Sequence, residues 1–146
     1  MPLLNYTTTV PGSRTAHQIV ELLANHGASQ ILLDYGQVRD GGSQVTGLSF
    51  AIETPHGVMR YRLPVDDEAV YTVLRGDRKV PNRFKTRVQA ERVAWRILKD
   101  WIEAQLAIVE TTMVSLDQVM LPYMLMGEGT VYDLYKAQQL AIEAPR

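Results

Sequence analysis

A long helical pattern over residues 85–111 limits most strongly how this chain can fold. A helix of that length spans about 40 Å, which is long for a chain of 146 residues. Apolar side chains recur along it at intervals of three and four residues, which predicts the stripe that packs on the core. The members of this predicted stripe are Val93, Ile97, Trp101, Ala104 and Ile108. The other elements must therefore pack along one dominant helix.

Strand patterns fill most of the chain before that helix. Runs of β-favouring or alternating residues predict four short strands. These runs lie at residues 5–10, 31–35, 45–54 and 58–63. A tight-turn sequence, Thr54–Gly57, joins the last two into a predicted hairpin with one apolar and one polar face. Arg60 and Arg62 lie on the polar face of that hairpin.

Capping patterns mark the remaining helices. The segment Thr15–Gln18 has the spacing of a capping box, and Gly27 is placed to end the helix that follows it. Three consecutive acids that start at Asp66 suit the start of a short helix over about 67–74. Further caps at Ser115 and Thr130 predict two more helices.

These elements predict a single α+β domain over residues 1–146. An antiparallel sheet of three or four strands, in the order β-α-β-β-β, is followed by the long helix and by shorter C-terminal helices. The apolar segment 119–126 is rich in methionine, a residue that adapts to irregular cores and to partner surfaces. It predicts either core packing or the interface of a homo-oligomer.

Residue usage excludes several kinds of site. The chain has no cysteine, so disulfides, thiolate metal sites and cysteine nucleophiles are excluded. Its three histidines share no metal-ligand spacing, and no serine lies in a nucleophile elbow. We therefore expect no enzyme activity, no cofactor and no metal. The sequence shows neither a signal peptide nor an apolar run long enough to cross a bilayer, so we expect a soluble cytoplasmic protein without a membrane partner.

Positive charge is concentrated in one segment, Arg75–Lys99. This segment has nine basic and two acidic residues, a net charge of +7, while the remaining residues have six basic and 14 acidic ones, a net charge of −8. The near-neutral total therefore hides a dipolar chain, and such a basic segment is suited to an anionic partner. The alternative is a solvated surface whose charges pair with Glu91, Asp100 and Glu103.

The binding hypothesis assigns roles within this segment. Basic residues would contact phosphates, and Trp95 or Phe84 would stack on a base if the nucleic acid is single-stranded. The phosphate contacts would come from Arg83, Lys85, Arg87, Arg92, Arg96 and Lys99. The last three share one helical face, with Trp95 near its edge. Arg60 and Arg62 would extend the patch if the long helix crosses their sheet. Basic residues in the first helical turn oppose the helix dipole, which favours a bound phosphate there.

Two resemblances bear on fold and function. The order of elements up to the long helix resembles that of double-stranded RNA-binding domains, α-β-β-β-α, whose last helix has a basic N-terminus that contacts phosphates. The segments Asn5–Thr9, Phe50–Pro64, Arg92–Gln105 and Leu121–Tyr123 resemble a family of small, uncharacterised bacteriophage and prophage proteins.

The phage resemblance implies a bacterial host cytoplasm and two kinds of role. One is the handling of nucleic acid. The other is anti-defence, in which the protein sequesters a small signalling nucleotide or binds a host defence protein.

Overall fold

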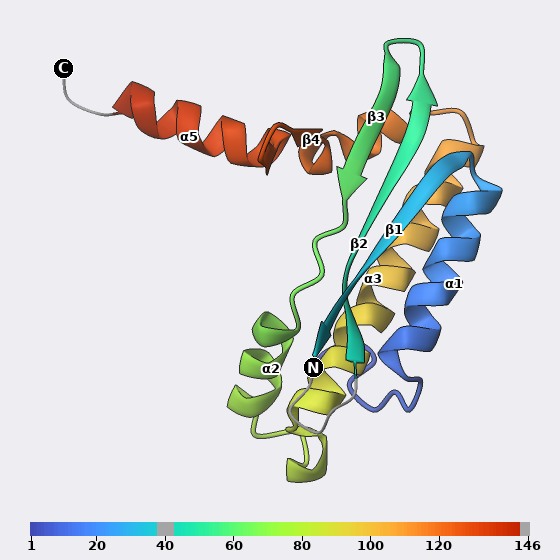
Figure 1. The fold of residues 1–146 in the computed structure, drawn as a ribbon. Coiled ribbons are helices and arrows are strands. Elements are labelled where there is room, and N and C mark those ends of the chain that lie inside the picture. Colours follow the sequence, from blue (N-terminus) through green and yellow to red (C-terminus); the bar gives the residue numbers. More distant parts are fainter. Residues whose placement is uncertain (38–42, 144–146) are drawn as a thin grey trace.

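A three-stranded antiparallel sheet with two helices packed on one face forms the body of the protein (Figure 1). The computed structural model describes residues 1–37 and 43–143. The body contains α1 (Gly12–Asn25), β1 (Ala28–Gln37), β2 (Ser43–Thr54), β3 (Gly57–Arg62), α2 (Asp67–Gly76), the 3-10 helix η1 (Asn82–Phe84) and α3 (Arg87–Glu110). The C-terminal elements are α4 (Leu116–Met120), the 3-10 helix η2 (Leu121–Tyr123), β4 (Leu125–Met126), β5 (Gly129–Thr130) and α5 (Val131–Glu143). The predicted α+β class is confirmed.

Alternation along the strands sets which face of the sheet is covered. In the register of the β2–β3 pair, Phe50 lies opposite Tyr61, and their buried rings stack at 5.3 Å between centroids. These rings face α1 and α3, whose apolar side chains complete the main core. The indole Nε1 of Trp95 on α3 donates a hydrogen bond of 3.2 Å to the carbonyl oxygen of Val45, which ties α3 directly to β2. The strand residues that alternate with Phe50 and Tyr61 lie on the opposite face of the sheet and point away from both helices.

The N-terminal segment differs from the prediction. Residues 5–10 form turns, not a strand, and lie against α3. The buried Gln89 on α3 donates from its side-chain nitrogen to the carbonyl oxygens of Tyr6 and Thr8, at 2.8 and 2.9 Å. A side chain thus satisfies the backbone acceptors that a neighbouring strand would have paired. The helix α1 begins at Gly12, so Thr15 is buried inside it and does not cap it.

The predicted stripe of α3 is confirmed at Val93, which is fully buried, but is wrong in phase toward the C-terminal end of the helix. Trp101 is half-buried, and Ala104 and Ile108 are exposed. The buried side chains of α3 are Gln89, Ala90, Val93, Ala94, Trp95, Leu98, Ile102 and Leu106. The reason is that α3 is apolar on two faces, and the sheet packs on the face that the spacing argument did not choose. On the other face, Trp101 makes an edge-on contact with Tyr123 at 5.4 Å.

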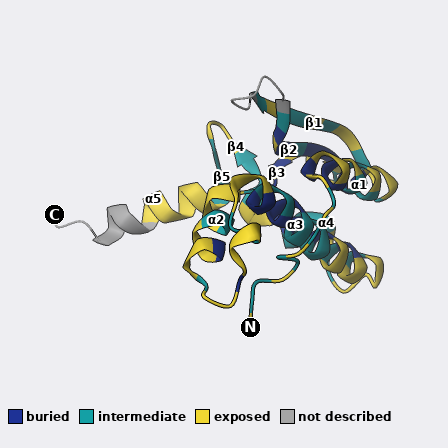
Figure 2. Ribbon diagram, turned by 90° about the horizontal axis from the view of Figure 1, so that it is seen from below, coloured by how far each residue is buried: buried dark blue, intermediate teal, exposed yellow. Residues whose placement is uncertain are grey.

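The C-terminal caps are confirmed. Ser115 and Gln118 form a reciprocal capping box at the start of α4. Thr130 and Asp133 do the same at α5, because each side chain accepts a hydrogen bond from the backbone nitrogen of the other. Gly27, with φ of 99°, follows the end of α1 as predicted. The helix α5 then extends away from the body, and most of its described surface is exposed (Figures 1 and 2).

A matched pair of substitutions on α3 tests which face is buried. Ile102 is 1% exposed and Ile108 is 40% exposed. We expect Ile102→Ala to lower the free energy of unfolding by about 2–5 kcal/mol, because it leaves a cavity in the main core. Ile108→Ala should cost less than about 1 kcal/mol. Urea denaturation of both variants measures the difference, and equal losses would contradict this packing.

One ionic contact joins the C-terminal ends of α1 and α3. The ring of His26 lies 2.7 Å through Nδ1 from the Leu22 carbonyl oxygen and 2.6 Å through Nε2 from the Glu110 carboxylate. Only the protonated ring donates from both nitrogens. The bond to Glu110, followed by the bond to the Leu22 carbonyl, therefore raises the pKa of His26 above its ordinary value of 6.5.

This contact makes the stability depend on pH. The folded-state pKa is raised, so the stabilisation is fully present below about pH 6.5 and is lost as the pH rises through the raised pKa. We expect the difference in unfolding free energy between the natural chain and His26→Gln to be largest at low pH. Urea denaturation from about pH 5 to about pH 9 measures it. His17→Gln, which removes a histidine but leaves the contact between His26 and Glu110 in place, is the control, and equal profiles for the two variants would contradict this account.

Candidate nucleic-acid interface

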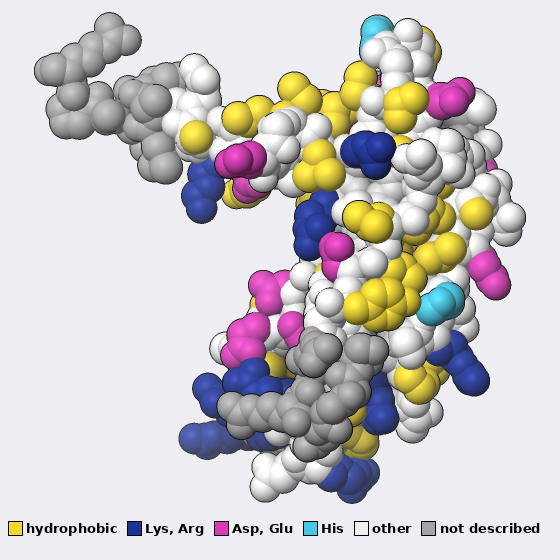
Figure 3. Space-filling view, in the orientation of Figure 1, with side chains coloured by type: hydrophobic (Ala, Val, Ile, Leu, Met, Phe, Trp, Pro, Cys, Tyr) yellow, Lys and Arg dark blue, Asp and Glu magenta, His cyan; other side chains and the backbone are white. Residues whose placement is uncertain are grey.

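Cationic side chains gather at one end of the molecule, where the chain passes from β3 into α3. Figure 3 shows Lys and Arg clustered at this lower end, around α2 and η1. We call this surface the basic end and define it by six residues. They are Arg75, Arg78, Lys79, Arg83, Lys85 and Arg87. All are exposed except Lys85, which is half-buried.

A second, smaller core holds the basic end in place. Leu74 from α2 and Val80 from the following loop are buried against Ala90 and Val93 of α3. Tyr6 and Phe84 pack on the same cluster and contact each other edge-on at 5.6 Å. The loop between α2 and α3 is thus anchored at several points. A fixed backbone presents the charges in one arrangement, which lowers the entropic cost of binding a partner.

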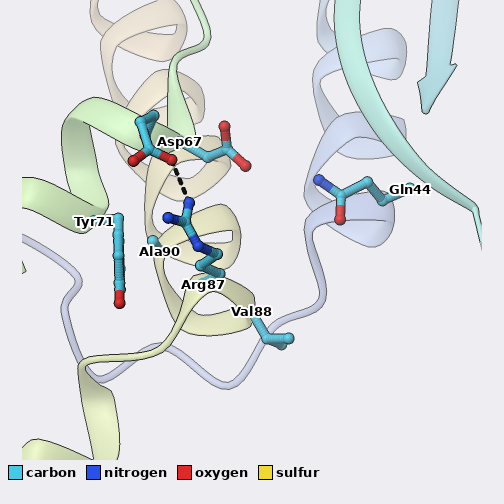
Figure 4. Close-up of a pocket in the computed structure, with 7 residues that line it drawn as sticks. Gln44, Asp67, Tyr71, Arg87, Val88 and Ala90 are labelled. Atoms are coloured by element: carbon cyan, nitrogen blue, oxygen red, sulfur yellow. Dashed lines mark hydrogen bonds and ion pairs between the residues drawn. The ribbon is translucent and has the colours of Figure 1, made fainter. Parts of the chain in front are cut away.

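Tyr71 on α2 organises two of the guanidinium groups. The guanidinium carbon of Arg87 lies 4.5 Å from the ring centroid, and that of Arg75 lies 5.4 Å from it. Arg87 also forms an ion pair with Glu68 (Figure 4). This carboxylate raises the pKa of Arg87. The first turn of α3 lacks an acid of its own, and Glu68 of α2 offsets the unfavourable placement of Arg87 there.

A pocket of about 340 Å³ lies beside Arg87 and extends toward Gln44 on β2 (Figure 4). Asp67 and Glu68 also line it, so its negative charge disfavours a phosphate in the pocket itself. Nearby, burial and the charge of Asp67 raise the pKa of Glu91. The best surface for an anion is therefore the exposed part of the basic end beyond Arg87.

The other five cations of the basic end are available to a partner. Within residues 1–37 and 43–143, no ion pair involves Arg75, Arg78, Lys79, Arg83 or Lys85. Arg83 lies over the ring of Phe84 at 4.7 Å, an arrangement that orients its guanidinium without neutralising it. Five cations that lack an ion pair among the described residues, held on a fixed scaffold, form a strongly positive surface.

The aromatic residues expected to stack on bases are otherwise engaged. Trp95 is 1% exposed in the main core, so its predicted place at the surface is wrong. Its large apolar ring is worth more to the core than to a solvated helix face. Phe84 is half-buried between Tyr6 and Arg83.

The helical part of the basic segment does not form an open cationic face. Arg92, Arg96 and Lys99 are all half-buried. Arg96 donates a hydrogen bond of 3.0 Å to Gln18 of α1, and Lys99 forms an ion pair with Glu103 one turn later. Since α1 packs against α3, this face helps to join the two helices. Glu103 neutralises the charge of Lys99, as expected if the basic segment is a solvated surface and not a binding site.

Arg60 and Arg62 do not extend the basic end. Tyr61 between them faces α3, so both arginines lie on the outer face of the sheet. There Arg60 donates to Gln30 at 3.1 Å, and Arg62 pairs with Asp34 at 3.0 Å. These pairs reach across small residues of β2: a Cβ added to Gly47 would lie 2.9 Å from both members of the second pair. The strand alternation that identified a polar face also separates it from α3.

The functional candidates that the predicted site residues left out are Tyr71, Arg75, Arg78 and Lys79, although the last three lie in the predicted basic segment. Tyr71 and Arg75 lie four residues apart on the short helix α2, a spacing that brings side chains together. This signal was present in the sequence. By contrast, nothing local indicates that Glu68 and Arg87, 19 residues apart, form an ion pair.

Comparison of the chain with protein-family models, with curated proteins and with solved structures found no match. Among residues 1–37 and 43–143, no helix is long and apolar enough to span a bilayer. The described part of the chain also contains no group of three or more histidines and acids positioned to hold a metal ion. Asp66 instead caps α2, since its side chain accepts a hydrogen bond from the backbone nitrogen of Ala69.

The anchoring of the basic end predicts its resistance to trypsin, which cleaves after Lys and Arg. Leu74 is fully buried, while its neighbour Val73 is 50% exposed. We expect Leu74→Ala to lower the free energy of unfolding by about 2–5 kcal/mol and to speed cleavage within residues 75–87. Mass spectrometry of brief digests locates the cuts. Val73→Ala is the control, and equal cleavage of both variants would show that Leu74 does not anchor this loop.

Proposed function

We propose that this protein is a non-catalytic nucleic-acid-binding protein that contacts phosphates through the basic end. The observation on which this proposal rests is the set of five exposed or half-buried cations that lack an ion pair among the described residues. Arg, which makes up three of them, suits phosphate because its planar guanidinium donates two parallel hydrogen bonds.

The geometry favours contacts with the nucleic-acid backbone over contacts with bases. Trp95 is buried, and the rings of Tyr71 and Phe84 already lie beneath guanidinium groups. Binding to single strands draws much of its energy from aromatic platforms, whereas a duplex presents its phosphates without any need for stacking. A duplex is therefore the preferred ligand under this proposal.

The topology supports the same preference by analogy. Elements α1, β1, β2, β3 and α3 follow the α-β-β-β-α order of double-stranded RNA-binding domains, with both helices on one face of the sheet. This chain inserts α2 and η1 before the last helix, and those insertions supply most of the basic end. The likeness to small bacteriophage proteins would place this binding in the cytoplasm of a bacterial host.

An anti-defence role, by capture of a signalling nucleotide, is our second proposal. The observation that favours it is a groove of about 560 Å³ on the outer sheet face, lined by Arg60, Arg62 and Leu32 among others. That volume suits a small ligand. Binding of a host defence protein would use the same outer face. A thermal-shift screen with cyclic nucleotides tests the capture of a nucleotide. A rise in melting temperature that Arg60→Gln/Arg62→Gln abolishes would support this role.

Two double variants with equal loss of charge test the first proposal. Arg78→Gln/Lys79→Gln removes two charges from the basic end, and Arg60→Gln/Arg62→Gln removes two from the outer sheet face. We expect the first to weaken binding to duplex RNA and DNA and to lower the slope of log K against log salt by about two, since each phosphate contact contributes about 0.9. Fluorescence anisotropy at several salt concentrations measures both quantities.

The control variant separates a local site from general attraction. Arg60→Gln/Arg62→Gln should bind duplexes nearly as the natural chain does. Equal weakening by both variants would point to net charge alone, and no binding of the natural chain at low salt would overturn the proposal. Charge reversal at Arg92 and Arg96 is less suitable, because both are half-buried and Arg96 bonds α1.

A further inference from the structure

The helix α5 forms an arm that leaves the body of the protein (Figure 1). Its main contacts are with β5 and η2, at its own base. Three large side chains on its first turns are exposed: Tyr132 at 54%, Leu134 at 51% and Tyr135 at 61%. A helix of 13 residues is marginal by itself in water, so its apolar side chains call for a packing partner.

An apolar groove lies on the body, between α2 and the outward face of α3. It has a volume of about 360 Å³ and is lined chiefly by apolar side chains. These include Val65, Ala69, Val70, Ile97, Leu98 and Trp101. Ile97 and Trp101 are the residues whose spacing predicted a buried stripe, and both remain half-buried in the isolated chain. A partner that fills this groove would complete their burial.

Charges at the arm and at the groove are complementary. Lys136 is exposed on α5, beside Tyr135. The groove is bordered by the N-terminal end of α2, where Asp66 lines it and the exposed Asp67 and Glu68 follow. Asp133 keeps its charge but is held at the base of the arm by the backbone nitrogen of Thr130, and Glu68 is paired with Arg87. Lys136, which has no ion pair among the described residues, is therefore the charge on the arm that can meet Asp66 and Asp67 at the edge of the groove.

We propose that the arm of one copy docks in the groove of a second copy, so that two chains exchange arms about a two-fold axis. Both complementary surfaces belong to this chain, yet in one chain α5 points away from α2 and α3 (Figure 1). A two-fold dimer makes the contact twice. Each arm is about 20 Å long, and two arm–groove contacts bury on the order of 1,000 Å², the lower range for a specific interface.

Engineered cysteines test this arrangement, because the natural chain has none. We would purify Leu134→Cys, on the arm, and Ala69→Cys, at the groove, separately, then mix and oxidise them. Arm exchange predicts a disulfide-linked pair of the two variants. Val58→Cys, an exposed site on the β2–β3 hairpin, replaces the arm variant in the control and should give far less cross-linked product. Equal yields in both mixtures would overturn the proposal.

Sedimentation of the full chain gives an independent readout. We expect a mass twice the 16.4 kDa of one chain, and a monomer for Leu134→Glu/Tyr135→Glu. Circular dichroism would verify that this variant is folded. A natural chain that is monomeric at tens of micromolar, or a double-cysteine chain that links internally because its own arm folds back, would overturn arm exchange. The result is independent of nucleic-acid binding, since no residue of the basic end takes part.

Discussion

Burial of α3 on two sides is the constraint on which the rest of the structure depends. One side packs on the sheet through Trp95, Leu98 and Ile102, and Trp95 also bonds the backbone of β2. The other side, nearer its N-terminus, forms a smaller core with α2 and the loop that follows. A single helix thus supports both the sheet and the basic end. Damage to α3 should therefore affect both at once, since they share one rigid element.

Electrostatics explains why the basic end needs that second core. Neighbouring cations repel one another, and each lowers the stability of any compact arrangement that concentrates them. Buried apolar side chains at Leu74 and Val80 hold the loop against that repulsion, while Tyr71 and Glu68 stabilise Arg87. Repulsion between cations that lack a partner lowers the stability of the folded segment. A bound anion would remove this repulsion, and the gain would add to the binding energy.

The sequence was most informative where the cause of structure is local. The β2–β3 hairpin follows from alternation and turn residues, and the caps at Ser115 and Thr130 follow from spacing within a few residues. The predictions failed where a distant partner decides. Gln89 takes the backbone acceptors of residues 5–10, a contact over more than 80 residues that no local pattern reveals.

The candidate site shows the same difference between local and distant causes. The concentration of charge at residues 75–87 was evident, and those residues do share one surface. Which apolar face of α3 meets the sheet, and which sheet face α3 covers, are questions of packing between elements that periodicity leaves open. Trp95 was therefore placed at the surface in error. Arg60 and Arg62 lie on the polar face of the sheet as predicted, but α3 covers the other face, so they do not extend the basic end.

The charge polarity of α2 connects the two proposed surfaces. A helix favours acids at its N-terminus and bases at its C-terminus because of its dipole. Asp66, Asp67 and Glu68 lie at the first end of α2 and Arg75 at the second, so this rule of local stability also sorts charge in space. The acidic end borders the apolar groove, and the opposite end opens the basic surface. One short helix thereby separates a surface suited to the arm of a second copy from a surface suited to phosphate. Both surfaces can then be occupied together, and a dimer would present two basic ends to a single long polyanion, where linked contacts strengthen each other.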